Sequence, residues 1–198
     1  MKKVDLLITG VGGQGNILAS DIIGEVALSA GYVVKKTDTL GMAQRGGSVI
    51  SNLRIARDVY SPLIGLGDVD ILLAFEKLEA ARWCRYLRPG GIAIVNNQAL
   101  PPLAVSLGNE QYPDDAEIAR IIKQLTENLH FVEGTRRARE LGNVRTLNIF
   151  MLGCVSVFLP FSVSLWKDSI SQRLPEKVRD INLTAFEQGR KEIRGVPL

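Results

Sequence analysis

The 198-residue sequence predicts an α/β fold of three layers, in which a mixed, mostly parallel sheet lies between helices on both faces. The chain opens with a strand, a glycine-rich loop, a helix and a second strand, which is a Rossmann-like start. Residues 70–95 repeat the order strand, helix, Gly-Gly and strand. The residues after 133 are mainly helical in pattern. We therefore expect one domain over 1–198, with an α/β part at 1–133 and a helical part at 134–198.

The first elements are short apolar runs that glycines separate. Residues 4–9 (VDLLIT) predict a strand that is buried on both faces. Residues 16–30 predict a helix, and Gly31 is placed to end it. A second strand is predicted at 32–37. A strand, helix and strand in this order generally form a right-handed parallel crossover.

The next region predicts antiparallel pairing. Residues 49–55 (VISNLRI) have strand character. Arg57-Asp58 would turn the chain into a short partner strand at Val59-Tyr60, which Pro62 would end. Such a hairpin would make the sheet mixed.

The chain then returns to the parallel α/β order. Residues 70–75 predict a buried strand, and residues 78–87 predict a helix that stops at the Arg-Pro-Gly-Gly sequence of 88–91. Residues 92–95 are the next strand. This order of elements is typical of three-layer α/β domains.

Further on, Asp114-Asp115 can cap a helix, and Phe131-Val132 suits a last short strand. The apolar residues 144–159 predict a fully buried helix that Pro160 ends. The overlapping stretch 147–166, in which nearly every residue is apolar or small, has about the length of a membrane span. Pro160 and the interspersed polar residues favour a buried helix, so we expect no membrane association.

The C-terminal residues predict one more helix. Pro175 suits its first turn, and Gly189 is expected to close it. From Arg190 onward the tail is expected to be solvated or to reach a partner.

Composition excludes several classes of function. The 24 basic and 21 acidic residues give a net charge of +3, without the basic face that nucleic-acid binding needs. Two cysteines, Cys84 and Cys154, are too few and too far apart for a disulfide framework or a cysteine-based metal site. The start of the chain does not resemble a signal peptide. These features predict a cytoplasmic protein with two buried free thiols.

A glycine loop follows the first strand. Gly10, Gly12 and Gly15 have the G-x-G-x-x-G spacing, in which glycines permit a tight turn before the positive end of a helix. Asp38 follows the second strand, near where nicotinamide-binding domains keep their ribose-binding acid. The loop therefore fits a dinucleotide (NAD or FAD), another anion or partner, or a ligand-free turn. Gly13 and Gln14 are unusual at the variable positions.

A second glycine-rich segment is Gln44-Arg45-Gly46-Gly47-Ser48. An arginine beside two glycines can present its guanidinium to a carboxylate or phosphate. The same pattern also suits a flexible loop with a solvated arginine. The two interpretations remain open on these residues alone.

The sequence lacks the residues that most catalytic mechanisms need. The single histidine, His130, is flanked by apolar residues and is expected to be structural. Two cysteines cannot hold an iron–sulfur cluster, which takes four thiolates. Gly67-Asp68 and Asn96-Asn97 superficially resemble a thiamine diphosphate motif, but Val69 replaces a glycine and Asp68 precedes a strand. No catalytic or metal-binding residue is expected.

Two stretches together resemble a known family. TGVGGQGNILASDIIGEVAL at 9–28 and DTLGMAQRGGSVISNLRI at 38–55 resemble the gamma-type domain of pyruvate:ferredoxin oxidoreductase and its 2-oxoacid relatives. The string GMAQRGGSV resembles in particular the beta subunit of indolepyruvate:ferredoxin oxidoreductase. The segments LNIFMLG and NLTAFEQGR fit as well, so the likeness spans almost the whole chain.

This resemblance implies an accessory subunit without its own catalytic centre or cofactor. Thiamine diphosphate and iron–sulfur clusters would lie on a catalytic alpha subunit, CoA would be a co-substrate, and ferredoxin would receive the electrons. The complex would convert aryl pyruvates to aryl-acetyl-CoA. Residues that match the family's glycine loop are Gly10, Gly12, Gly13, Gln14 and Gly15; those of the second loop, expected near the partner or the CoA side, are Met42, Gln44, Arg45, Gly46 and Gly47.

Two other functions remain as rivals. An independent oxidoreductase would bind NAD or FAD at the glycine loop, with Asp38 on the ribose. A stand-alone scaffold would form a homodimer, and the isolated accessory subunit could also be a homodimer. Binding of NADH or FAD would favour the first rival, and failure to retain a cluster-bearing partner would favour the second.

Overall fold

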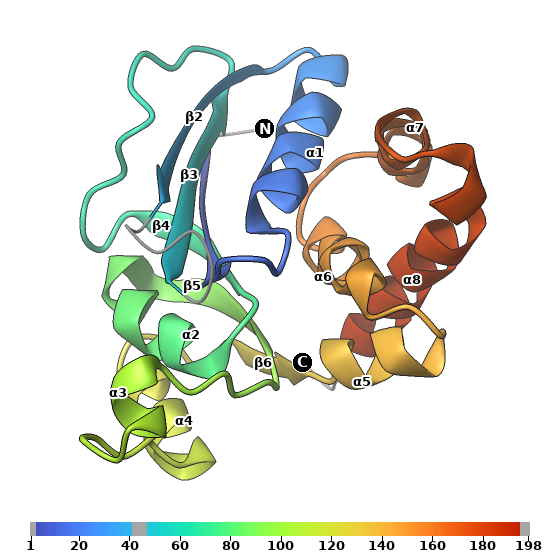
Figure 1. The fold of residues 1–198 in the computed structure, drawn as a ribbon. Coiled ribbons are helices and arrows are strands. Elements are labelled where there is room, and N and C mark those ends of the chain that lie inside the picture. Colours follow the sequence, from blue (N-terminus) through green and yellow to red (C-terminus); the bar gives the residue numbers. More distant parts are fainter. Residues whose placement is uncertain (1–2, 41–46, 195–198) are drawn as a thin grey trace.

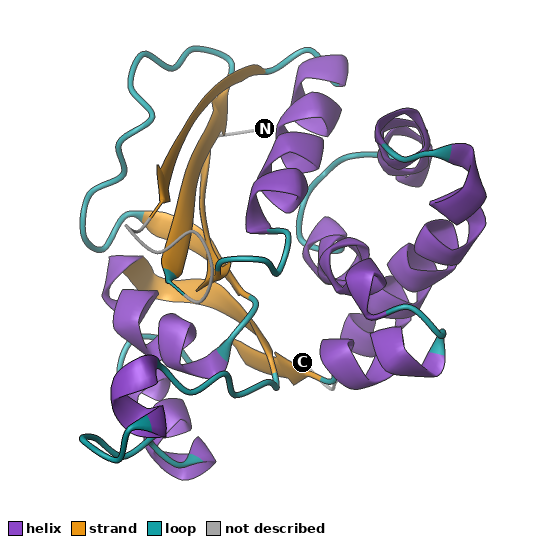
Figure 2. Cartoon of the chain, in the orientation of Figure 1, coloured by secondary structure: helices purple, strands orange, loops and turns teal. Residues whose placement is uncertain are grey.

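The computed structural model describes residues 3–40 and 47–194. Within these residues the chain forms one six-stranded sheet in the order β2-β3-β1-β4-β5-β6, with helices on both faces (Figure 1). Figure 2 shows the two groups of helices on either side of the orange sheet. The predicted three-layer α/β fold with a mixed sheet is confirmed.

Four neighbouring strands are parallel. They are β1 (Val4–Val11), β4 (Val69–Ala74), β5 (Leu87–Asn96) and β6 (Leu129–Val132). β1 and β4 are almost fully buried, as expected for parallel strands that helices cover on both faces. The strands predicted at 4–9, 70–75, 92–95 and 131–132 are confirmed.

The other two strands correct the predicted pairing. β3 (Ser48–Ala56) lies between β1 and β2 (Val33–Leu40) and is antiparallel to both. The second strand therefore runs in the same direction as β1 but is not its neighbour. The hairpin predicted with Val59-Tyr60 is wrong, because residues 57–68 contain no strand and Tyr60 is 91% exposed. β3 buries its apolar side chains by pairing with β1 and β2 instead.

One face of the sheet is covered by α1 (Asn16–Ser29), α6 (Leu147–Ser156), α7 (Val163–Arg173) and α8 (Glu176–Arg194) (Figure 1). Their buried side chains and those of this sheet face belong to one hydrophobic cluster. α5 (Gly134–Glu140) and a 3-10 turn (Val144–Thr146) contact α6 and α8. The C-terminal helices therefore contribute to the hydrophobic core on this face of the sheet.

α6 and α8 pack with their main chains in close approach. All ten residues of α6 are buried, so the fully buried helix predicted at 144–159 is confirmed over 147–156. Val144 instead begins the 3-10 turn and is 51% exposed. Gly189 was expected to close α8, but the helix continues to Arg194, and Gly189 lies against the main chain of α6. Arg190, expected in a tail that is solvated or reaches a partner, is buried and donates a hydrogen bond to Ser156 Oγ at 2.7 Å. Packing on α6 has overridden the local helix-ending signal.

The opposite face is covered by α2 (Lys77–Trp83), a 3-10 turn (Cys84–Tyr86) and α4 (Asp115–Lys123), with the short α3 (Leu103–Ser106) nearby. Asp114 caps α4 by accepting a hydrogen bond from the backbone N–H of Glu117, as predicted. The helices α3, α5 and α7 were not individually predicted. In the described part of the chain, no helix has the length and apolar character to cross a membrane.

Candidate functional site

The glycine loop joins the carboxyl end of β1 to the N-terminus of α1. Gly13 and Gly15 have φ angles of +105° and +86°, a left-handed conformation that favours glycine. At Gly10, a Cβ atom would lie 2.8 Å from Phe75 Cβ on the neighbouring strand end. These glycines are therefore required by the turn and by its close packing.

Gln14 fills the interior of this loop. Its Oε1 accepts a hydrogen bond from the backbone N–H of Val11 at 2.8 Å, and its Nε2 donates to the carbonyl oxygen of Phe75 at 3.0 Å. The Val11 N–H is therefore already bonded within the protein. Gln14, the unusual residue of the motif, therefore links the end of β1 to the end of β4 by hydrogen bonds.

The glycine loop also contacts the second loop. Gly12 N–H donates to the carbonyl oxygen of Gly47 at 2.8 Å. The next residue, Ser48, donates through Oγ to Glu79 on α2, whose other carboxylate oxygen accepts from Arg82 at 2.6 Å. Glu79 is 2% exposed and was not identified from the sequence. The two family-like motifs thus meet at Gly12 and Gly47.

The remaining candidates of the second loop are Met42, Gln44, Arg45 and Gly46. They lie outside the described residues.

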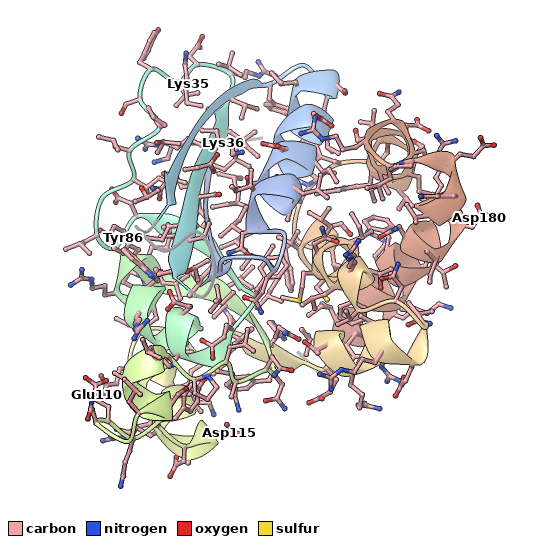
Figure 3. The ribbon with its side chains drawn as sticks, in the orientation of Figure 1. Lys35, Lys36, Tyr86, Glu110, Asp115 and Asp180 are labelled. Atoms are coloured by element: carbon pink, nitrogen blue, oxygen red, sulfur yellow. The ribbon has the colours of Figure 1, made fainter. Side chains whose placement is uncertain are left out.

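Asp38 is not placed to bind a ribose beside the glycine loop. It lies on β2, which β3 separates from β1, whereas a dinucleotide domain has the acid-bearing strand next to β1. Its carboxylate accepts from Ser51 Oγ at 2.5 Å and pairs with Lys36 at 3.0 Å. Lys36, labelled in Figure 3, also pairs with Asp21 of α1. Asp38 therefore helps attach β2 to β3 and α1.

The thiamine-like residues lie at opposite ends of two adjacent parallel strands. Asp68 precedes β4, whereas Asn96 ends the parallel strand β5. Asn96 is buried and donates to the carbonyl oxygen of Phe75 at 3.0 Å and to Thr135 Oγ1 at 2.9 Å. It ties three strand ends together, and the rejection of a thiamine motif is supported.

The buried His130 and the two thiols lie apart from this site. The ring centroids of His130 and Phe158 lie 5.5 Å apart, and burial lowers the pKa of His130. Burial raises the pKa of Cys84 and Cys154, both free and buried as predicted. These groups are poorly suited to proton transfer or nucleophilic attack.

A cavity of about 650 Å³ opens beside the glycine loop. Its lining includes Gly13 after β1, Gln98 after β5 and Thr135 after β6, so it lies at the carboxyl ends of parallel strands. Here α1 and α2 leave adjacent strands toward opposite faces. Open α/β sheets bind their ligands at such a position, and the volume is in the range of small-molecule sites.

Comparison with known proteins gives consistent results. Residues 5–192 match the family described as "Pyruvate ferredoxin/flavodoxin oxidoreductase". The chain is 38% identical over 194 residues to indolepyruvate oxidoreductase subunit IorB of Pyrococcus horikoshii, covering 96% of each protein.

Two solved structures share the fold. The chain matches the 2-oxoglutarate:ferredoxin oxidoreductase from Magnetococcus marinus with a TM-score of 0.76 and 22% identity, covering 100% of this chain and 32% of that one. It matches the gamma subunit of a keto/oxoacid ferredoxin oxidoreductase from Geobacter sulfurreducens with a TM-score of 0.69 and 23% identity, over 98% and 99% of the two chains.

Proposed function

The chain belongs to the pyruvate ferredoxin/flavodoxin oxidoreductase family, and we propose that it is the accessory subunit of an indolepyruvate:ferredoxin oxidoreductase. The observation that carries the proposal is the 38% identity to an indolepyruvate oxidoreductase subunit over 96% of both proteins. The complex would oxidatively decarboxylate aryl pyruvates to aryl-acetyl-CoA and pass the electrons to ferredoxin.

The residues of this chain support a division of labour with a catalytic alpha subunit. Its two cysteines fall short of the four thiolates that an iron–sulfur cluster takes. The thiamine-like residues Asp68 and Asn96 lie at opposite ends of the adjacent parallel strands β4 and β5. Thiamine diphosphate and the clusters would therefore be held by the partner, and the isolated chain would be inactive.

The contact between the two loops is the proposed interaction site. Gly47 is bonded to Gly12, and Ser48 is bonded to the buried Glu79, so the C-terminal end of the second loop is attached to both β1 and α2. Arg45 stands two residues before Gly47 in the sequence. We propose that its guanidinium binds the partner subunit or a phosphate of CoA, because arginine forms paired hydrogen bonds with carboxylate and phosphate groups.

The subunit assignment is tested by capturing the tagged full-length chain from its native cell and recording the visible spectrum. We expect a larger subunit to co-purify with the broad absorbance of iron–sulfur clusters. Activity toward aryl pyruvates should then require both subunits. Turnover by the purified chain alone, supplied with CoA, thiamine diphosphate and an electron acceptor, would contradict the proposal.

The role of Arg45 is tested in the reconstituted complex. Arg45→Ala should raise the Michaelis constant for CoA or weaken assembly by about tenfold, since one charged hydrogen-bonding group is lost. Arg57→Ala, which removes an exposed arginine from the loop after β3, is the matched control. If Arg45→Ala and Arg57→Ala behave alike in both measurements, the proposed role of Arg45 is wrong.

A further inference from the structure

The cavity beside the glycine loop is lined by several segments of this chain that lie far apart in the sequence. The N-terminal turn of α1, the end of α5, the 3-10 turn at Val144–Thr146 and the first turn of α8 all contribute to its lining. Its lining combines unpaired positive charge, an unbonded amide and apolar side chains.

Three cationic side chains line the cavity: Arg139, Arg145 and Lys177. All three are exposed, and within residues 3–40 and 47–194 none has an acidic side chain within ion-pair distance. Arg136, on the same helix as Arg139 but outside the cavity, pairs with Glu140 at 2.9 Å. No aspartate or glutamate lines the cavity among the described residues. Its rim therefore carries positive charge that is available to an anion.

The buried amide of Asn148 adds a hydrogen-bond donor to the wall. Asn148 is 7% exposed, and its Oδ1 accepts from the backbone N–H of Ile149 at 2.8 Å. For its Nδ2 no acceptor lies within hydrogen-bond distance in the described part of the chain. Asn148 lines the cavity, so this amide N–H is available to donate to a ligand oxygen there.

The N-terminus of α1 reinforces this polarity. Gly15 and Leu18 line the cavity, and the 14-residue helix has neither an acidic residue in its first turn nor a side-chain cap. The free N–H groups at a helix start carry a partial positive charge. Together with Asn148 and the three cations, they favour a ligand with negative charge.

Apolar side chains make up much of the remaining lining and define the body of the ligand. The other polar residues of the lining are Gln14, Gln98, Thr135, Asn143 and Asn182. Leu18, Leu100 and Leu147 come from three different segments, and Val144, Leu174 and Val178 complete this surface. Apolar surface favours a ligand that buries hydrocarbon or a ring. We infer that the cavity binds a small amphipathic anion, with an apolar body and a terminal carboxylate or phosphate.

The test is isothermal titration calorimetry on the full-length chain with three probes that share one ring: phenylacetate, phenyl phosphate and benzyl alcohol. At least one anion should bind about tenfold more tightly than the neutral alcohol, and rising salt should weaken that binding. Tighter phenylacetate binding identifies a carboxylate ligand, tighter phenyl phosphate binding a phosphate ligand, and equal binding supports the shared anionic chemistry. If benzyl alcohol binds as tightly as the two anions, or if no probe binds at millimolar concentration, the inference is overturned.

Substitutions then locate the site. Arg145→Gln and Lys177→Gln should each weaken the tighter anion by up to about tenfold. Asn148→Asp, which is nearly isosteric, should abolish binding because it adds a carboxylate to the wall. Arg136→Gln, outside the cavity, is the matched control and should bind as the native chain does. If Asn148→Asp does not fold, Arg145→Gln and Lys177→Gln still test whether the anion binds in the cavity. Native affinity in both of them, or an equal loss in Arg136→Gln, overturns the assignment.

Discussion

Replacing Gly189 with alanine tests the main-chain contact between α6 and α8. A Cβ atom there would lie 2.0 Å from the carbonyl oxygen of Phe150 and 3.1 Å from the backbone nitrogen of Cys154. Carbon–oxygen contacts ordinarily begin at about 3.3 Å, so the helices must separate locally by about 1.3 Å. The obstacle is main chain within a fully buried helix, which a side-chain rotation cannot relieve.

The expected loss of stability follows from two opposing effects. Overpacking of a core costs about 1–3 kcal/mol, and a main-chain obstacle places Gly189→Ala near 3 kcal/mol. Alanine recovers about 1 kcal/mol through its higher helix propensity. The net loss of about 2 kcal/mol should lower the melting temperature of a chain of this size by about 4–8 °C.

Gly24→Ala on α1 is the matched control. Its Cβ would meet only side-chain atoms, at 3.7 Å from Val34 and 3.9 Å from Leu53, which are ordinary contacts. This variant should be more stable by up to about 1 kcal/mol, through helix propensity. Urea unfolding and thermal melts measure both variants. If Gly189→Ala is as stable as Gly24→Ala, the close approach of α6 and α8 is refuted.

Three further changes probe the buried polar groups. Gln14→Glu replaces the donor to the Phe75 carbonyl with an oxygen, and urea unfolding should show a loss of about 1–3 kcal/mol. Tyr112→Phe removes a hydroxyl that donates to the buried carboxylate of Glu76, and should cost about 1.5–3 kcal/mol in the same assay; an unchanged midpoint would argue against that bond. Burial lowers the pKa of His130 below its ordinary 6.5, so the unfolded chain binds the proton more readily and stability should fall as pH drops below about 6.5. Urea midpoints measured across this range should depend less on pH in His130→Gln, and an identical dependence would refute this explanation.

The parallel part of the sheet was predictable because its signals are local. Runs such as 4–9 and 70–75 are mostly apolar, which indicates strands buried on both faces. Asp114 marks a helix start within a single turn. The pairing of β2 was not predictable in this way. The residues of β2 would be the same whether it paired with β1 or, as it does, with β3.

In the candidate site, too, the local features were predictable from the sequence and the long-range contacts were not. The spacing of Gly10, Gly12 and Gly15 identifies a tight loop from sequence alone, since left-handed φ angles and close packing require glycine. The role of Gln14 depends on a carbonyl group 61 residues away, at Phe75. Glu79 likewise lies in an ordinary helical pattern, and only its contact with Ser48 distinguishes it.

The sequence by itself determined the main strands and helices of the α/β part, the two glycine-containing loops and the family, because each depends on residues that are close along the chain. Only the tertiary structure decided that Gly189 is a packing residue, that Gly12 meets Gly47, and that Arg145 and Lys177 line one cavity. These facts depend on which distant segments share a surface. That choice is made by burial of the whole core, which no short window of sequence contains.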